Sequence, residues 1–145
     1  MKIRIVAVGK IKERATRSLV DDYLGRLKRY CAVEEIELKP STTTKEAAAF
    51  AKATDGAHAI ALDAAGKGLD SRRFARGLER WASQGKGEIA FLIGGADGLP
   101  DEVRQHAQAI WSLSPLTFPH RLARVVLAEQ LYRGMTILRG EPYDK

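Results

Sequence analysis

The residues best suited to chemistry lie in the last third of the chain, where a glycine-rich turn, a hydroxyl-rich loop and a histidine follow one another. The turn is "GGADG" at Gly94–Gly98, directly after an apolar run, and the loop is "LSPLTFPH" at Leu113–His120. Glycines let a ligand approach the backbone closely, although a tight turn needing positive φ explains such a pattern equally well. The apolar and small hydroxyl side chains of Leu113–Phe118 favour a slot for a flat ring such as adenine, read by main-chain N–H and C=O groups. The alternative is a plain loop with a helix cap.

Two common phosphate-binding motifs are absent from the sequence. The dinucleotide fingerprint needs G-x-G-x-x-G after the first strand, where this chain has a lone Gly9 followed by Lys10. The P-loop needs G-x-x-x-x-G-K-[ST], and "GKGLDS" at Gly66–Ser71 has neither that spacing nor the Lys-Ser pair. Any ligand must therefore be held by another arrangement.

Apolar runs alternate with longer helical patterns, which is typical of an α/β sheet covered by helices. The patterns predict a single domain, 1–145, with five strands and five helices. The expected strands are Lys2–Val8, Val33–Lys39, Ala57–Asp63, Glu88–Ile93 and Ala109–Leu113. The expected helices are Thr16–Tyr30, Lys45–Thr54, Ser71–Ser83, Asp101–Ala107 and Pro119–Leu138, with Thr43 or Thr44 as the N-cap of the second.

Open α/β sheets bind ligands beyond the carboxyl ends of their strands. Three late strands are followed by Leu62–Gly68, Ile93–Gly98 and Leu113–His120. We expect these three loops to converge on one pocket.

Composition excludes several classes of protein. With 24 Lys+Arg against 18 Asp+Glu, the net charge of +6 favours a polyanionic partner such as nucleic acid, with simple solubility as the alternative. Two groups of cations stand out: Lys10, Lys12, Arg14 and Arg17 near the first loop, and Arg72, Arg73, Arg76 and Arg80 at helical spacing. No run approaches the ~20 apolar residues of a membrane helix and no signal peptide is evident, so a soluble, cytoplasmic protein is expected. The lone Cys31, expected to be buried, excludes an internal disulfide, and three scattered histidines predict no metal site.

The last predicted helix, Pro119–Leu138, is apolar almost all round. One sheet face cannot cover every such residue, so we expect part of this helix to form a two-fold dimer interface. Its charged residues are expected to pair across that interface or to border the site, because an unpaired buried charge is costly; they are Arg121, Arg124, Glu129 and Arg133.

Six segments closely resemble the bacterial ribosomal RNA large-subunit methyltransferase H family, from end to end of the chain. They are "VAVGK", "IALDAAGKGLDS", "FLIGGADGLP", "WSLSPLTFPH", "RVVLAEQLYRGMTI" and "GEPYDK". The resemblance implies a SPOUT-type α/β fold with an open, mostly parallel sheet, helices on both faces and a C-terminal trefoil knot. It further implies a homodimer that uses S-adenosyl-L-methionine to methylate N3 of a pseudouridine in 23S rRNA within the assembled ribosome.

The resemblance also assigns roles to residues. It implies that the cofactor is contacted by Leu62, Gly94, Leu113, Ser114, Pro115, Leu116, Thr117 and Phe118. It implies that His120, Arg133 and Tyr143 border the RNA base, with the tail supplied by the partner subunit. Where the family usually has a histidine after Pro142–Tyr143, this chain has Asp144.

Methylation at N3 requires loss of the ring proton, which a positioned base assists. His120 and Asp144 are the candidates, although His120 suits a helix-capping role equally well. Arg133 is expected to hold a phosphate or stabilise charge on the ring, and Asp144 to orient Arg133. Tyr143 is expected either to stack on the base or to pin the tail. Two other functions stay open: a catalytically weakened ribosome-binding protein, and a SPOUT enzyme acting on tRNA.

Overall fold

The computed structural model describes residues 1–84 and 87–145 and contains five strands and five helices in strict alternation. The strands are β1 (Lys2–Val8), β2 (Ala32–Leu38), β3 (His58–Gly68), β4 (Glu88–Ile93) and β5 (Ala109–Ser112). The helices are α1 (Arg14–Leu27), α2 (Thr43–Ala53), α3 (Ser71–Gln84), α4 (Asp101–His106) and α5 (His120–Leu138). The α/β class predicted from the sequence is confirmed.

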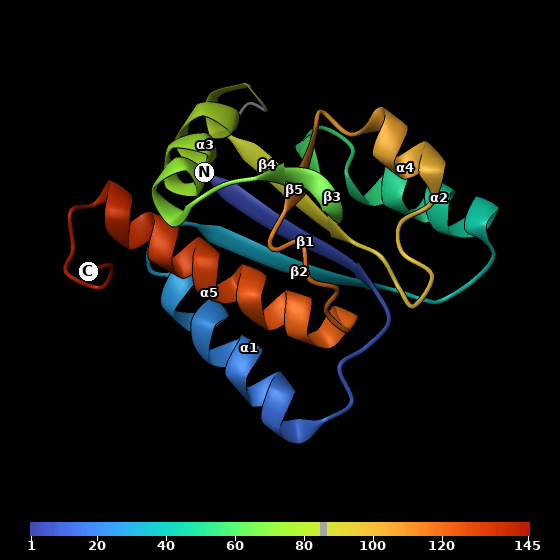
Figure 1. Ribbon diagram of the computed structural model, residues 1–145, viewed down its shortest axis with the longest axis horizontal. Helices are drawn as coiled ribbons and strands as arrows, with labels where there is room; N and C mark the ends of the chain where they lie inside the picture. Colours follow the sequence, from blue (N-terminus) through green and yellow to red (C-terminus); the bar gives the residue numbers. More distant parts are fainter. Residues whose placement is uncertain (85–86) are drawn as a thin grey trace.

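The strands form one parallel sheet in the order β2-β1-β4-β3-β5. Helices α1, α3 and α5 lie on one face, and α2 and α4 lie on the other (Figure 1). The order places the carboxyl ends of β1, β4 and β3 side by side, where ligands bind in open α/β sheets.

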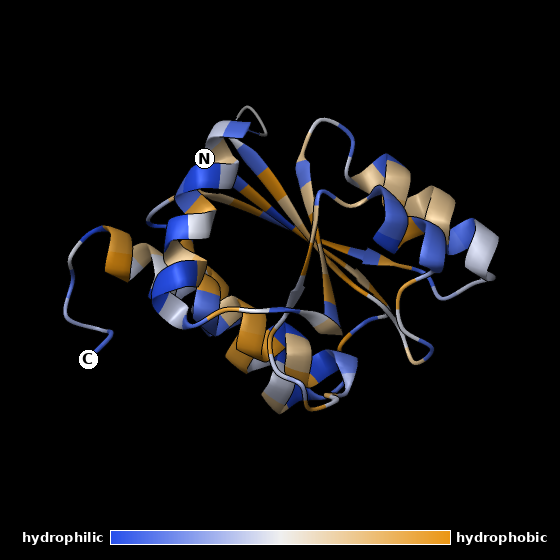
Figure 2. Cartoon of the chain, turned by 45° about the horizontal axis from the view of Figure 1, so that its top comes forward, coloured by the Kyte–Doolittle hydropathy of each residue, from blue (hydrophilic) through white to orange (hydrophobic). Residues whose placement is uncertain are grey.

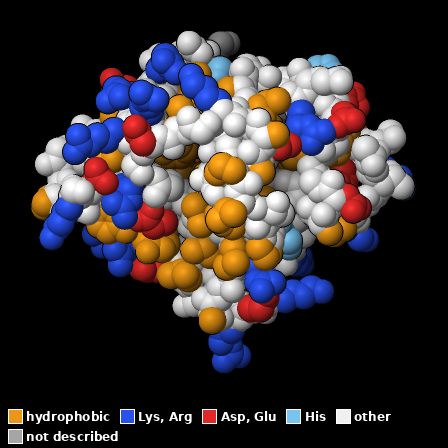
Figure 3. Space-filling view, in the orientation of Figure 1, with side chains coloured by type: hydrophobic (Ala, Val, Ile, Leu, Met, Phe, Trp, Pro, Cys, Tyr) orange, Lys and Arg blue, Asp and Glu red, His pale blue; other side chains and the backbone are white. Residues whose placement is uncertain are grey.

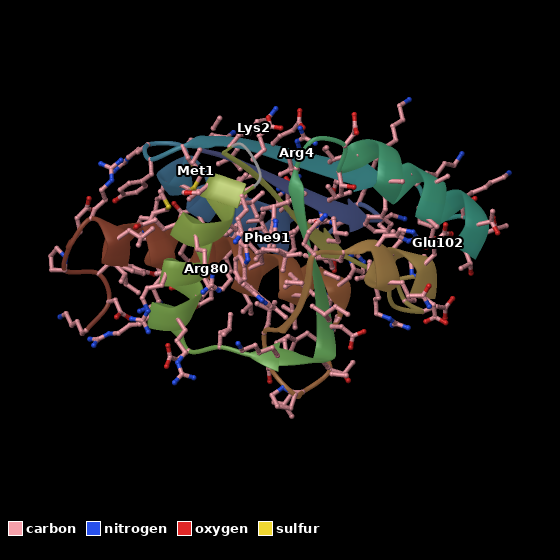
Figure 4. All side chains as sticks on the ribbon, turned by 90° about the horizontal axis from the view of Figure 1, so that it is seen from above. Met1, Lys2, Arg4, Arg80, Phe91 and Glu102 are labelled. Carbon is pink, nitrogen blue, oxygen red and sulfur yellow. The ribbon has the colours of Figure 1, made fainter. Side chains whose placement is uncertain are left out.

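The central strands are buried on both faces over most of their length, and β4 is apolar throughout Ile89–Ile93. Figure 2 shows hydrophobic segments gathered in the sheet. In β1, Ile3, Ile5 and Ala7 belong to the core under α1, α3 and α5. Val6 and Val8 belong to the core under α2 and α4. Figure 4 places Phe91 of β4 in the interior of the first core. This alternation follows from the two-residue period of a strand.

Several predicted boundaries need correction. Strand β3 continues to Gly68 rather than ending at Asp63, because a register shift between Leu62 and Lys67 lets its last residues pair again with β5. A Cβ on Gly66 would approach the Ile110 carbonyl oxygen to 2.8 Å, so only glycine permits this close approach. The N-cap of α2 is Thr42, whose side chain accepts from the Lys45 amide, rather than Thr43 or Thr44.

Helix α5 is covered more completely within one protomer than its sequence suggested. Helices α1 and α3 flank it on both sides, and Leu127 and Leu131 are fully buried. Leu122 of α5 is a large apolar residue that stays exposed, with 43% of its surface accessible to solvent. The neighbouring helices therefore account for most of the apolar circumference, and only the outer stripe is left for the expected dimer interface.

The charged residues of α5, which were expected to pair across an interface or to border the site, pair within the chain and do not line the pocket. Arg124 is fully buried and contacts Glu35 at 2.9 Å and Glu37 at 2.5 Å, both from β2, while also donating to the Gly9 carbonyl at 2.9 Å. Arg121 pairs with Glu13 at 3.0 Å. A buried cation needs such partners, and the contacts of Arg124 tie α5 to β2 and to the end of β1.

Cys31 is only half-buried, not fully buried as expected, and this partial burial raises the pKa of its thiol. In the described ranges, no helix is both long and apolar enough to cross a membrane. Those same residues contain no group of three His, Cys, Asp or Glu side chains placed to hold a metal ion.

Candidate functional site

One pocket of about 270 Å³ is lined by Leu62–Ala64 of β3, at the register shift in its pairing with β5, and by the segments that follow β4 and β5. That volume lies near the lower end for small-molecule sites. Of the residues expected to contact a cofactor, Leu62, Gly94 and five residues of the hydroxyl-rich loop line it: Leu113, Ser114, Leu116, Thr117 and Phe118. Pro115 does not line the pocket, although its neighbours on both sides do. The three segments therefore converge as predicted, but the first of them, Leu62–Gly68, belongs to β3 and is not a loop that follows it.

Gly94 is required by the turn itself. A Cβ at this position would overlap the backbone of Gly98 and Leu99, which cannot move without opening the turn. Gly98 has φ +77°, a conformation that favours glycine, and its amide donates to the Gly95 carbonyl. The positive-φ explanation therefore holds for Gly98, whereas Gly94 is required by the close approach of the Gly98–Leu99 backbone. This turn shapes the pocket wall.

The backbone of Leu113–Phe118 is partly free to bind a ligand. The Leu116 amide donates to the Ser114 hydroxyl at 3.0 Å, which forms a local turn. By contrast, the amides of Thr117 and Phe118 have no hydrogen-bond acceptor among the described residues. Unpaired N–H groups beside an apolar slot are what main-chain reading of a heteroaromatic ring requires.

His120 begins α5 and forms part of the pocket wall. Its imidazole lies beside Gly9 at the end of β1, and its buried Nδ1 has no partner among the described residues. Burial lowers the pKa of His120, and the nearby Arg124 and Arg121 lower it further. The ring is therefore neutral at pH 7 and able to accept a proton.

Asp63 is a pocket residue that sequence reasoning missed. It is the only carboxylate lining the pocket in the described part of the chain. Arg104 of α4 contacts its Oδ2 at 3.0 Å, and the Ala65 amide donates to its Oδ1 at 2.9 Å. These contacts orient the carboxylate while leaving lone pairs that can accept from a ligand. Its position in "ALD", directly after Leu62 at the end of the predicted strand, was the available signal.

The other predicted site residues lie at the opposite end of α5. Arg133 lies thirteen positions after His120, which corresponds to about 20 Å along a helix. Tyr143 and Asp144 lie beside Arg133, because the tail folds back onto its own α5. One protomer therefore does not bring Arg133, Tyr143 and Asp144 to the pocket that His120 lines.

The docked tail is held by a network of ion pairs and ring contacts. Arg133 contacts Asp144 at 3.0 Å and Glu129 at 2.8 Å, and Arg72 of α3 lies 3.8 Å from Asp144. These neighbouring carboxylates raise the pKa of the Arg133 guanidinium. Asp144 thus lies where it can orient Arg133, and its role in catalysis stays a prediction.

Tyr143 pins the tail rather than offering a free face. Its hydroxyl donates to Glu129 at 2.8 Å, and burial together with that hydrogen bond raises its pKa. The Arg133 guanidinium lies 4.7 Å from the centre of its ring, and the Tyr132 ring packs edge-on at 4.6 Å. Both contacts occupy the ring in this conformation.

The first basic group from the sequence is only partly available to an anion. Arg17 is committed to Glu35 at 2.6 Å and to Asp21 at 2.8 Å. Lys10, Lys12 and Arg14 are exposed, and no described carboxylate lies within 4 Å of them.

Comparisons with known proteins agree with this fold and site. A family model described as "Predicted SPOUT methyltransferase" matches residues 1–144, so the chain belongs to the SPOUT methyltransferase family. Relatives named "Ribosomal RNA large subunit methyltransferase H" match over nearly their whole length. The protein of Sorangium cellulosum (strain So ce56) is 56% identical over 143 residues, which are 99% of each chain. That of Anaeromyxobacter dehalogenans (strain 2CP-C) is 44% identical and fully covered on both sides.

Solved structures show the same fold at low sequence identity. A probable methylase family protein from Haemophilus influenzae Rd KW20 superimposes with a TM-score of 0.61 at 12% identity, covering 99% of this chain and 70% of the other. A probable methyltransferase from Bordetella pertussis Tohama I gives 0.59 at 13% identity, covering 92% and 95%.

Proposed function

We propose that this protein transfers a methyl group from S-adenosyl-L-methionine to N3 of a pseudouridine in 23S rRNA, within the assembled ribosome in the cytoplasm. The relatives' names and the family support RNA methylation. The observation that carries the proposal is the pocket lined by Leu62–Ala64 of β3, by the segments after β4 and β5, and by His120. The trefoil knot stays a prediction of family membership.

The pocket residues fit this cofactor. The slot between Leu62, Leu113 and Phe118 suits the adenine ring, and the unpaired amides of Thr117 and Phe118 suit its edge. Asp63 supplies a carboxylate that attracts a cationic ligand and accepts from a hydroxyl group. When bound, the cofactor supplies an electrophilic methyl group on a sulfonium.

The chain's own residues then position the base and remove its proton. His120 is neutral and lines the pocket, so it is placed to accept the N3 proton as the nitrogen attacks. Holding the two reactants in line and excluding water supplies much of the rate enhancement in such a displacement. Arg133 supplies a positive charge for a phosphate or for the ring carbonyls, and Asp144 fixes its orientation.

This division of labour requires a homodimer. A two-fold axis crossing α5 near Val126 would place His120 of one chain opposite Arg133 of the other, because isologous contacts are reciprocal. The exposed Leu116 at 71% and Leu122 at 43% lie where such a partner would cover them. Figure 3 shows an apolar area on this face, over β5, the following segment and the first turns of α5.

A complementation experiment tests the shared site. One chain carries His120→Asn and the other carries Tyr143→Phe with Asp144→Asn; each alone should fail to methylate ribosomes while binding the cofactor normally. Refolding an equal mixture should restore about one quarter of wild-type activity, because half of the dimers are mixed and each has one intact composite site. Mass spectrometry of rRNA nucleosides identifies the product. No restoration on mixing would place all catalytic groups within one chain, and the absence of any methylated nucleoside in the wild type would overturn the proposed function.

A further inference from the structure

A second concave surface lies between α3 and β5, away from the cofactor pocket. It encloses about 390 Å³, and four cations surround it: Lys67 from the end of β3 and Arg73, Arg76 and Arg80 from α3. Figure 3 shows Lys and Arg side chains gathered over α3, at the upper left of the molecule, and Figure 4 locates Arg80 on that helix. We call this surface the α3–β5 groove.

The cations of the α3–β5 groove are largely uncompensated, unlike most arginines of this protein. Arg4, Arg17, Arg104, Arg124 and Arg133 each lie within about 3 Å of a carboxylate. Among the described residues, no carboxylate lies within 4 Å of Lys67, Arg76 or Arg80, and Arg73 has only the exposed Asp70 at 3.9 Å. Four exposed cations in one groove with a single weak counter-charge create a positive potential that an anion would relieve.

The geometry of the α3–β5 groove suits an extended anion rather than a single phosphate. Arg73, Arg76 and Arg80 follow one stripe of α3 and span about 10 Å at 1.5 Å per residue. The Arg80 guanidinium is stacked on the Trp81 indole at 5.0 Å, which holds its planar donors in a fixed orientation.

The floor of the groove is apolar and rigid. Trp81 and Trp111 pack together there with ring centres 3.8 Å apart, and Ile110 of the edge strand β5 is 37% exposed. Gly77 makes this packing possible, since a Cβ there would lie 2.5 Å from Trp81 and 2.9 Å from Trp111. A low-dielectric floor strengthens the attraction of the surrounding cations for phosphate and offers apolar contact to a ribose or base.

We propose that the α3–β5 groove binds the sugar–phosphate backbone of an RNA strand, as a docking surface separate from the methyl-transfer pocket. This proposal rests on the proposed function for the identity of the RNA as rRNA. It adds that substrate affinity is set largely outside the pocket, through phosphate contacts that carry no sequence information.

The test compares two double variants with equal loss of charge. Arg76→Gln with Arg80→Gln removes two groove cations, whereas Lys45→Gln with Lys52→Gln removes two exposed cations from α2 on the opposite sheet face. Binding to purified ribosomes and to a uridine oligonucleotide is measured across a salt series, and cofactor affinity and melting temperature are measured in parallel. The groove variant should make the negative slope of log K against log [salt] shallower by about two for both ligands, one unit for each lost phosphate contact. The α2 variant should leave the slopes unchanged, and both variants should bind the cofactor like the wild type.

Three results would overturn the groove proposal: unchanged slopes in the groove variant, an equal fall in the α2 variant, or weakened ribosome binding with unchanged oligonucleotide binding. The last result would assign the groove to an acidic ribosomal protein. Failure of the proposed function can be told apart from failure of the groove proposal. If the wild-type protein methylates no rRNA but the groove variant still binds the oligonucleotide more weakly than the wild type does, the groove proposal stands and the proposed function fails.

Discussion

Arg124→Met should destabilise the protein strongly, although Arg124 is outside the pocket lining. Its side chain is fully buried and makes three charged or polar contacts, to Glu35, Glu37 and the Gly9 carbonyl. Through Gly9 it also fixes the end of β1 against which His120 lies. The substitution keeps much of the side-chain volume but removes the cation that these three acceptors share.

The size of the effect follows from what remains after the substitution. Removing one partner of a buried ion pair costs about 3–5 kcal/mol. Arg17 still lies 2.6 Å from Glu35 and 3.7 Å from Glu37, and the two carboxylates keep 16% and 26% exposure, so some charge stays compensated. We therefore expect a loss near the lower end, about 3 kcal/mol, and a melting temperature lower by roughly 10 °C for a chain of this size.

Thermal and urea unfolding at one fixed protein concentration measure this loss, since dimerisation would make stability depend on concentration. Arg121→Met is the matched control, because Arg121 pairs with Glu13 on the surface, where ion pairs contribute about 0–1 kcal/mol. Adding Glu37→Gln to Arg124→Met restores the charge balance and should recover part of the stability. A loss from Arg124→Met no greater than that from Arg121→Met would refute the reasoning.

Three further predictions concern the site. Gly94→Ala should reduce both the cofactor affinity and the melting temperature, as measured by calorimetry. Gly68→Ala should change neither, because a Cβ at Gly68 would face open space. Equal effects of the two substitutions would refute the inference that the turn requires glycine at position 94. Leu122→Glu should dissociate the dimer into folded protomers, as measured by sedimentation velocity. Leu131→Glu should instead unfold the chain, because Leu131 is fully buried. A Leu122→Glu protein that stays dimeric would show that the interface lies elsewhere. Burial lowers the pKa of His120 below its ordinary 6.5. The rate of ribosome methylation should therefore be constant above pH 6.5 and fall at lower pH as the ring is protonated. If a His120→Asn protein is active and shows the same fall in rate at low pH, His120 is not the base.

The sequence was sufficient to predict the α/β architecture and the location of the pocket. Strands buried on both faces are continuous apolar runs, and amphipathic helices between them have their own period, so the type of each element is encoded locally. Because the carboxyl ends of parallel strands meet at one edge, the sequence alone predicts that Leu62, Gly94 and Leu113 lie close together. The family motifs pointed to the same loops.

Only the tertiary structure decided which charges are paired and which are free. Arg124 and Arg76 look alike in the sequence, yet one is buried against Glu35 and Glu37 while the other borders an open groove. Those partners are far apart along the chain, and no local pattern specifies them. The same holds for the return of β3 to pair with β5, which depends on Gly66 meeting the Ile110 backbone.

The tertiary structure also separated residues that the motifs had grouped as one site. His120 and Arg133 are both polar positions of one helix, but the rise of an α-helix places them about 20 Å apart. The sequence by itself determined the elements and the chemistry of the loops, because these depend on neighbouring residues. The family resemblance implied that the tail comes from the partner subunit, but the distances depend on how the elements pack, and for that reason only the folded chain shows the tail docked on its own α5, away from His120.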